Sequence, residues 1–169
     1  MAGKIISILL LLTAAAVGGG VYYAQVYGFY DEVTEADVRL TTNATATQEP
    51  ILFDAFEGID AYSSPIRYRA CFTTPTSLAT LTETYELFDG AEPLNAPYWF
   101  DCFDAEALGA ELAAGTALAF AGQRNFEYGI DRVVAITADG RGYIWHQVND
   151  CGDKLYDGSP AGDDCPERN

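Results

Sequence analysis

The feature that most constrains this chain is a long uncharged segment near its N-terminus. Between Lys4 and Asp31 no side chain carries a charge, and residues 5–23 alone approach the ~20 apolar residues with which a helix crosses a membrane. Because Lys4 precedes the segment and acidic residues follow it, the positive-inside rule predicts a cytoplasmic N-terminus and an extracytoplasmic remainder. Aromatic residues, which favour the boundary between acyl chains and water, gather at its far end: Tyr22, Tyr23, Tyr27, Phe29 and Tyr30.

A cleaved secretory signal is the alternative interpretation of this segment. Lys4, the apolar residues 5–12 and the small residues 14–16 fit its three regions. The apolar character continues to Tyr23, which favours a retained membrane anchor over residues 5–30, and the remainder is exported in either case. Ala14, Ala15 and Ala16 each lie four residues before Gly18, Gly19 and Gly20. This spacing lets another transmembrane protein approach the helix closely, although an alanine and glycine run without a partner explains the composition equally well.

The residues after this segment form one strongly acidic domain. The chain has 169 residues and a formal net charge of -16, and all 25 acidic residues follow position 30. Such a surface repels phosphate groups, which excludes nucleic acid as a partner and favours a basic protein. Solubility alone also explains the excess of acid. We divide the chain into an anchor (1–30), a membrane-proximal segment and linker (31–50), a domain (51–149) and an acidic tail with two cysteines (150–169).

Local patterns predict an α+β fold for the domain. Residues 66–73 alternate apolar and polar side chains, as in a half-buried strand. Strands are predicted over 66–73, 82–88, 116–120, 130–137 and 142–148, with a helical turn near Pro75. Asp104 is a good N-cap for a helix that Gly115 ends, and Asp139-Gly140 marks a hairpin turn. The order predicts an antiparallel sheet with one packed helix. Residues 41–50 are small and polar, and they indicate a loop.

Four cysteines lie beyond the anchor, at Cys71, Cys102, Cys151 and Cys165. The predicted topology places them in an oxidising compartment, so we expect two disulfides. Of the three connectivities we favour Cys151–Cys165, which fastens the tail, and by elimination Cys71–Cys102. The alternative is thiol or metal chemistry, because arginines near Cys71 favour a reactive thiolate and His146 could complete a copper site. No CxxC occurs and the spacings match no zinc motif, so we assign no metal ligand and no cofactor.

The sequence contains no recognisable catalytic motif. GxSxG, HExxH, the phosphate-binding GxxxxGK[ST] and the dinucleotide fingerprint are all missing, which disfavours the common hydrolases and kinases. The sole histidine, His146, alternates with Trp145 and is expected to be a hydrogen-bonded strand residue. An aromatic group around Cys102 is a candidate interaction patch, with core packing around a disulfide as the alternative. Its members are Tyr98, Trp99, Phe100 and Phe103.

Four stretches connect the chain to a protein family. They are SSPIRYRACF (63–72), PLNAPYWFDCFDA (93–105), YGIDRVVAI (128–136) and DGRGYIWHQVNDCG (139–152). They resemble an alphaproteobacterial family of small membrane-anchored proteins of unknown function, some of which are automatically labelled histidine kinase. The chain contradicts that label, since it has no nucleotide-binding motif and its histidine lies on the exported side. The resemblance implies a bacterial inner-membrane protein with a periplasmic domain.

Two functional hypotheses follow. The first is a non-catalytic accessory or assembly protein of an envelope complex, because the chain joins an anchor with a small-residue face to a domain without evident chemistry. The second is a periplasmic thiol-redox or metal-binding protein, which requires free or exchangeable cysteines. We favour the first hypothesis.

Overall fold

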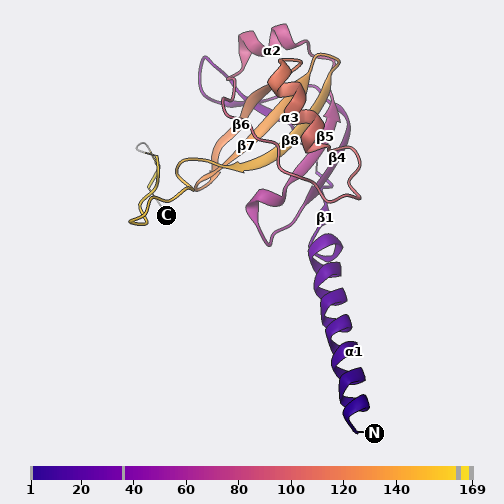
Figure 1. Cartoon of the computed structure of the whole chain (residues 1–169). Coiled ribbons are helices and arrows are strands. Elements are labelled where there is room, and N and C mark those ends of the chain that lie inside the picture. The colour runs from indigo at the N-terminus through magenta and orange to yellow at the C-terminus, as the bar shows by residue number, and fades with distance from the viewer. Residues whose placement is uncertain (1, 36, 163–164, 168–169) are drawn as a thin grey trace.

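The computed structural model describes residues 2–35, 37–162 and 165–167. A long helix, α1 (Ala2–Tyr23), projects from a folded domain, and the C-terminal residues extend from the side of the domain (Figure 1). A single π-helical turn, Ala24–Gly28, continues α1 without a break. Together they form a span, Gly3–Gly28, that is long and apolar enough to cross a membrane.

The domain is built on a six-stranded antiparallel sheet with the strand order β1-β4-β5-β8-β7-β6. The strands are β1 (Asp31–Glu32), β4 (Asp54–Asp60), β5 (Arg69–Thr73), β6 (Ala117–Glu127), β7 (Ile130–Thr137) and β8 (Arg141–Val148). β7 and β8 form the predicted hairpin, and Gly140 in its turn has φ 86°. A Cβ there would lie 2.5 Å from the carbonyl oxygen of Thr74, so this position also requires glycine for space.

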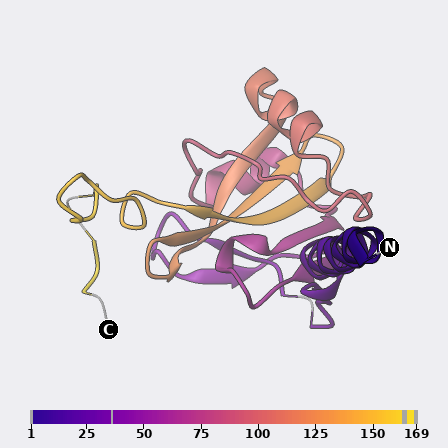
Figure 2. The same ribbon diagram turned by 60° about the horizontal axis from the view of Figure 1, so that its bottom comes forward.

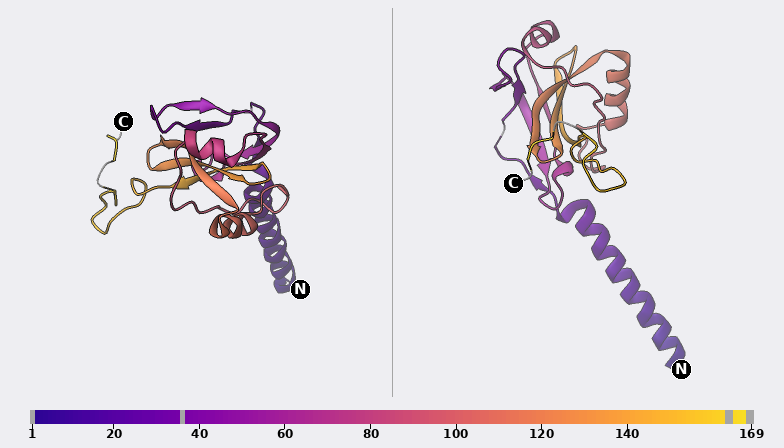
Figure 3. Two further views of the ribbon diagram at one scale, coloured as in Figure 1. Left: turned by 90° about the horizontal axis from the view of Figure 1, so that it is seen from above. Right: turned by 90° about the vertical axis from the view of Figure 1, so that its left-hand side faces the viewer.

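Both faces of the sheet are covered (Figures 2 and 3). The helix α3 (Ala105–Ala114) and the loop before it lie on one face. The hairpin of β2 (Arg39–Thr41) and β3 (Gln48–Pro50) covers the other face together with the helix α2 (Leu78–Thr84). The prediction of an α+β fold with an apolar N-terminal helix, an antiparallel sheet, a packed helix and disulfides is therefore confirmed.

Each face of the sheet has its own hydrophobic core. Trp145, Phe103 and Leu108 belong to the core under α3, whereas Phe120 and Leu81 belong to the core under the hairpin and α2. The central strand β5 sends Cys71 to the first core and its two neighbours, Ala70 and Phe72, to the second. The predicted alternation is right, but a half-buried strand is wrong, because both of its faces are covered. β5 also begins only at Arg69, since Pro65–Arg67 form a 3-10 turn.

The helix α3 begins and ends at the predicted residues. The Asp104 carboxylate accepts a hydrogen bond from the Ala107 N–H at 3.0 Å, and Gly115 closes the helix with φ 70°. The predicted strand over 82–88 is partly wrong, because α2 continues to Thr84. The N-cap of α2 is Ser77, whose hydroxyl accepts a hydrogen bond from the Thr80 N–H. The buried side chain of Leu81 packs α2 against the sheet.

The predicted loop over residues 41–50 is only partly right, because residues 43–47 form a turn but strands stand on both sides of it. β2 and β3 pair there, and Val38 and Leu40 next to them are completely buried. An extended segment after α2 pairs with the hairpin at Thr42↔Tyr85 and with β6 at Leu87↔Phe120. The hairpin is thus connected to the edge of the main sheet, and the membrane-proximal residues contribute to the folded domain.

Candidate functional site at the junction of the helix and the domain

The C-terminal end of α1 is joined to the domain by a partly buried hydrogen bond and several aromatic contacts. Phe29 closes the π-helical turn by donating its N–H to the Ala24 carbonyl at 3.1 Å. The carbonyl oxygen of Val26, within the turn, accepts a hydrogen bond of 2.7 Å from the indole Nε1–H of Trp99. Because Trp99 belongs to the loop before α3, this bond links the end of the apolar span to the loop on the α3 face of the sheet.

Ring contacts extend this link. The Trp99 ring stacks on Tyr27 with the planes 18° apart and meets Tyr30 edge-on, at centroid distances of 6.1 and 5.8 Å. Tyr98 also meets Tyr27 edge-on, and their hydroxyl groups are hydrogen-bonded. The Arg67 guanidinium lies over the Tyr30 ring, 5.7 Å from its centre. We call Tyr27, Tyr30, Tyr98 and Trp99 the aromatic junction.

The four residues of the predicted interaction patch do not form one surface. Tyr98 and Trp99 belong to the aromatic junction, whereas Phe100 and Phe103 are buried in the core under α3. Phe103 meets the rings of Tyr143 and Trp145 edge-on. Contact of this patch with a partner stays a prediction. The sequence showed the tyrosines after α1 as a separate group, and no spacing rule connects them to a tryptophan about seventy residues later.

The disulfide Cys71–Cys102 fixes the loop that carries Trp99. It joins β5 to this loop, with the two Cα atoms 6.2 Å apart. Arg69, also on β5, holds the same loop from its other end, because its guanidinium donates to the carbonyl oxygens of Leu94 at 2.7 Å and Asn95 at 3.2 Å. The same guanidinium also donates to the carbonyl oxygens of Ile66 and Tyr68. Burial lowers the pKa of Arg69 to about 10. This buried cation therefore has a positioning role for the junction loop.

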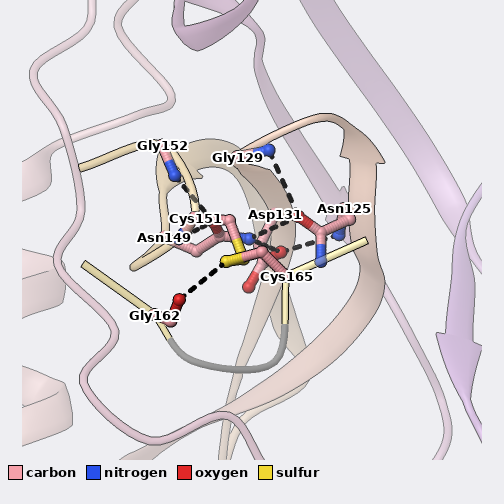
Figure 4. Close-up of a disulfide and its surroundings, with 8 residues drawn as sticks. All are labelled: Asn125, Gly129, Asp131, Asn149, Cys151, Gly152, Gly162 and Cys165. Carbon is pink, nitrogen blue, oxygen red and sulfur yellow. Dashed lines mark hydrogen bonds between the residues drawn. A yellow bond between two sulfur atoms is a disulfide. The ribbon is translucent and has the colours of Figure 1, made fainter. Parts of the chain in front are cut away.

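The second disulfide, Cys151–Cys165, fastens the C-terminal tail near the turn between β6 and β7 (Figure 4). Beside it, the buried carboxylate of Asp131 accepts hydrogen bonds from the Asn149 side chain at 2.6 Å and the Asn125 N–H at 2.8 Å. Asn149 in turn accepts from the Cys151 N–H at 3.0 Å. The carboxylate thus connects the turn to the first residue of the disulfide.

His146 is a structural residue, as the sequence suggested. Its ring is stacked between Tyr68 and Phe126, at centroid distances of 4.7 and 4.2 Å. Arg132 Nε donates to His146 Nε2 at 3.0 Å, so Nδ1 carries the proton and donates to the Pro65 carbonyl at 2.6 Å. Burial lowers the pKa of His146 to about 4. The imidazole is therefore neutral at pH 7 and fully engaged.

The hypothesis of a copper site finds no support in the geometry of the described residues. Among the residues that the structure describes, no group of three or more His, Cys, Asp or Glu side chains is placed to hold a metal ion. The proposed copper ligands Cys71 and Cys102 are bonded to each other, which leaves no thiolate for a metal. Both disulfides have the connectivity that the sequence favoured.

A pocket of about 470 Å³ opens beside the aromatic junction. Trp99, Phe56 and Ile59 form the apolar side of the pocket. Three carboxylates also line the pocket, those of Glu32, Glu57 and Asp101. Within the described part of the chain, these carboxylates have no ion-pair partner. The surface near the junction is therefore negatively charged around an apolar depression.

Comparison with known proteins identifies the family. The model of a family of unknown function, DUF6446, matches residues 38–166. The chain belongs to this family. In this DUF6446 protein the match begins at Val38, the first fully buried residue before β2, and includes both disulfides and Trp99. Comparisons with curated proteins and with solved structures gave no match.

Proposed function

We propose that this DUF6446 protein is a single-pass protein of the bacterial inner membrane with a cytoplasmic N-terminus and a periplasmic domain. Its role is that of a non-catalytic binding or assembly subunit of an envelope complex. The observation that carries the proposal is the hydrogen bond from Trp99 to Val26 within the aromatic junction, which joins the apolar span to the domain.

The anchor and its orientation rest on three observations. The span Gly3–Gly28 is long and apolar enough to cross a bilayer. Lys4 lies at its start and the acidic residues lie beyond its end, as the positive-inside rule requires for a cytoplasmic N-terminus. Two disulfides are compatible with an oxidising periplasm.

A binding role explains why the anchor is packed against the domain. A tether that only keeps a protein at the membrane needs no fixed geometry, and a flexible linker suffices. Here Trp99 and Tyr27 hold the domain at one height and orientation above the bilayer. Such a fixed geometry reduces the entropy that is lost when a membrane partner binds helix and domain together.

The helix offers a surface for such a partner. Gly18, Gly19 and Gly20 lie in the second half of the span, and a Cβ added at any of them would meet no neighbouring atom within 4 Å. Small residues at this spacing allow close approach of a second transmembrane helix. On the domain, the unpaired carboxylates beside the junction favour a basic periplasmic surface.

Native electrophoresis of the extracted protein tests the assembly role. We expect the protein, expressed at its native level and extracted in mild detergent, to migrate in a complex larger than the monomer. Gly19→Leu should shift it toward the monomer, because the leucine blocks close helix packing. Gly3→Leu is the matched control, since its Cβ also meets no atom of the chain but it lies outside the small-residue face. Migration of the unmodified protein as a monomer would refute the role.

Intact-mass measurement tests the anchor and the thiol alternative together. The membrane-extracted protein is alkylated without reductant and weighed. We expect an uncleaved N-terminus and no alkylated cysteine, because the structure contains no free cysteine. A mass that lacks the first residues would show a cleaved signal, and alkylated cysteines would favour the thiol function.

A further inference from the structure

We propose that the domain makes a second contact with the membrane, through exposed tyrosines on two loops beside α1. These are Tyr62, between β4 and the 3-10 turn, and Tyr98, in the loop before α3. Their partner is the headgroup region of the outer leaflet. This inference rests on the proposed anchor and adds that the domain lies against the lipid surface.

Tyr98 is placed at the membrane boundary by its contact with α1. Its hydroxyl is bonded to that of Tyr27, which lies inside the apolar span Gly3–Gly28. Tyr98 is nevertheless 67% exposed, so most of its ring faces the surroundings of the helix. At the end of a membrane span these surroundings are lipid headgroups, which tyrosine prefers because its ring is apolar and its hydroxyl is polar.

Tyr62 reaches the same level by a different route. Asp31, three residues after the span, pairs with Asp60 at the end of β4. Tyr62 follows Asp60 by two residues, which span at most about 7 Å, and it lies in a turn that the Ser64 N–H closes by donating to the Ala61 carbonyl. Its side chain is 90% exposed. The loop after β4 lies close to the domain end of α1 in two views at right angles (Figures 1 and 3).

The charges on this side of the domain select the kind of lipid. Asp31, Glu32 and Asp60 lie next to the end of the span, and Asp101 lies beside Trp99. These carboxylates repel anionic headgroups and can approach the ammonium groups of zwitterionic lipids. The expected surface is therefore a zwitterionic headgroup layer into which the two tyrosines insert.

Quenching by brominated lipid tests the contact in the full-length protein. The chain is placed in nanodiscs of phosphatidylcholine whose acyl chains carry bromine near the headgroup, or in unbrominated discs. Tyr62→Trp adds a reporter at an exposed site that the fold does not need. The control is Leu52→Trp, also exposed (73%) but located before β4, at the end of this seven-residue strand opposite Tyr62. We expect loss of the added emission for Tyr62→Trp and none for Leu52→Trp.

Trp99 separates this inference from the proposed anchor. The unmodified protein has two tryptophans, Trp99 and Trp145. Because Trp145 is completely buried in the core, any quenching of the protein's emission by lipid reports Trp99. Quenching of Trp99 without quenching at position 62 would overturn the inference and leave the anchor standing. No quenching of Trp99 would overturn both. Purified discs contain no other protein, so quenching at position 62 assigns the contact to lipid.

Discussion

The indole of Trp99 donates its Nε1–H to the backbone carbonyl of Val26 at 2.7 Å. The bond joins two segments that are 73 residues apart and belong to different parts of the molecule, a membrane-type helix and a disulfide-linked loop. It satisfies a carbonyl oxygen in the turn that closes the apolar span, where an unpaired polar group would be costly near lipid. The orientation of the domain on its helix thus depends on this bond together with the ring contacts of the aromatic junction.

Replacement of Trp99 should loosen this junction without unfolding the domain. Trp99→Phe keeps a ring for stacking on Tyr27 but removes the hydrogen bond, which contributes about 0.5–1.5 kcal/mol. We expect faster cleavage by Glu-C protease at Glu32 and Glu35, which follow the junction, with the melting temperature little changed. Tyr156→Phe, in the fully exposed tail, is the control and should not alter cleavage. An unchanged cleavage rate for Trp99→Phe would show that the bond does not hold the junction.

The two disulfides should differ in their contribution to stability. Cys71–Cys102 closes a separation of 31 residues and crosses the core, so its replacement by a Ser pair should lower the free energy of unfolding by about 4 kcal/mol. Cys151–Cys165 closes 14 residues, for which chain entropy gives an upper value of about 3 kcal/mol. Its effect on global unfolding should be smaller than this, because residues 153–161 of the closed loop are exposed and add little to the core. Removal of the second disulfide should instead accelerate trypsin cleavage at the exposed Lys154. Denaturant unfolding and timed proteolysis measure the two effects, and equal losses of global stability would contradict the prediction.

His146 should make the domain less stable in mild acid. The pKa of the folded-state imidazole is about 4, against an ordinary value of 6.5, because the ring is buried and lies near Arg132 and Arg69. Between these two pKa values the unfolded chain binds a proton that the folded chain does not. The stabilisation is therefore complete above pH 6.5 and decreases as the pH falls to 4, by on the order of 3 kcal/mol.

Comparison with His146→Gln isolates this contribution. Glutamine does not titrate, yet it offers one donor and one acceptor for Pro65 and Arg132. Thermal unfolding in detergent at pH 7, 5 and 4 should show a smaller loss of stability in the variant than in the unmodified protein. Parallel losses in both proteins would mean that other groups cause the acid sensitivity.

Asp131 should determine how firmly the tail is held. Asp131→Ala removes the Oδ1 that accepts from both the Asn149 side chain and the Asn125 N–H, and the Oδ2 that accepts from Arg124. We expect a destabilisation of about 1–3 kcal/mol, because buried donors lose their acceptor. Hydrogen exchange should increase at the Cys151 and Gly152 amides, both of which donate to Asn149. Asp157→Ala, in the exposed tail, is the matched control. Unchanged protection of the two amides in Asp131→Ala would refute the role.

Several elements of the fold could be predicted from local sequence because their signals are local. The helix α3 has its N-cap at Asp104 and its stop at Gly115, and both residues bond to groups no more than four residues away in the sequence. The β7–β8 hairpin has its turn at Asp139-Gly140, between two segments rich in β-branched and aromatic residues. The uncharged span needs only its own length and composition. The pairing Cys151–Cys165 was favoured because both residues lie in the same tail.

Other elements had no local signal. β2 and β3 are only three residues long and mostly polar, and we attribute their pairing to the burial of Leu40 and Val38 against the sheet. The segment 82–88 has the composition of a strand, yet Ser77 caps a helix into its first residues. The sequence of β5 alternates like that of a strand with one solvent-exposed face, but both faces of the sheet are covered at its position, so both faces of the strand are buried. In each case the contacts that decide the structure come from residues far along the chain.

The residues of the candidate site likewise fall into those that local sequence could predict and those that long-range contacts decide. The sequence by itself determined the apolar span, its aromatic end, the acidic domain, the four paired cysteines and the lack of catalytic motifs, since each depends on residue type and short spacing. Only the tertiary structure decided that Trp99 and Tyr98 meet the end of α1 while Phe100 and Phe103 enter the core. These four residues are close in sequence, and their burial is set by a loop that Arg69 and Cys71 hold from the neighbouring strand. Side-chain direction in such a loop depends on long-range contacts, which no local pattern encodes.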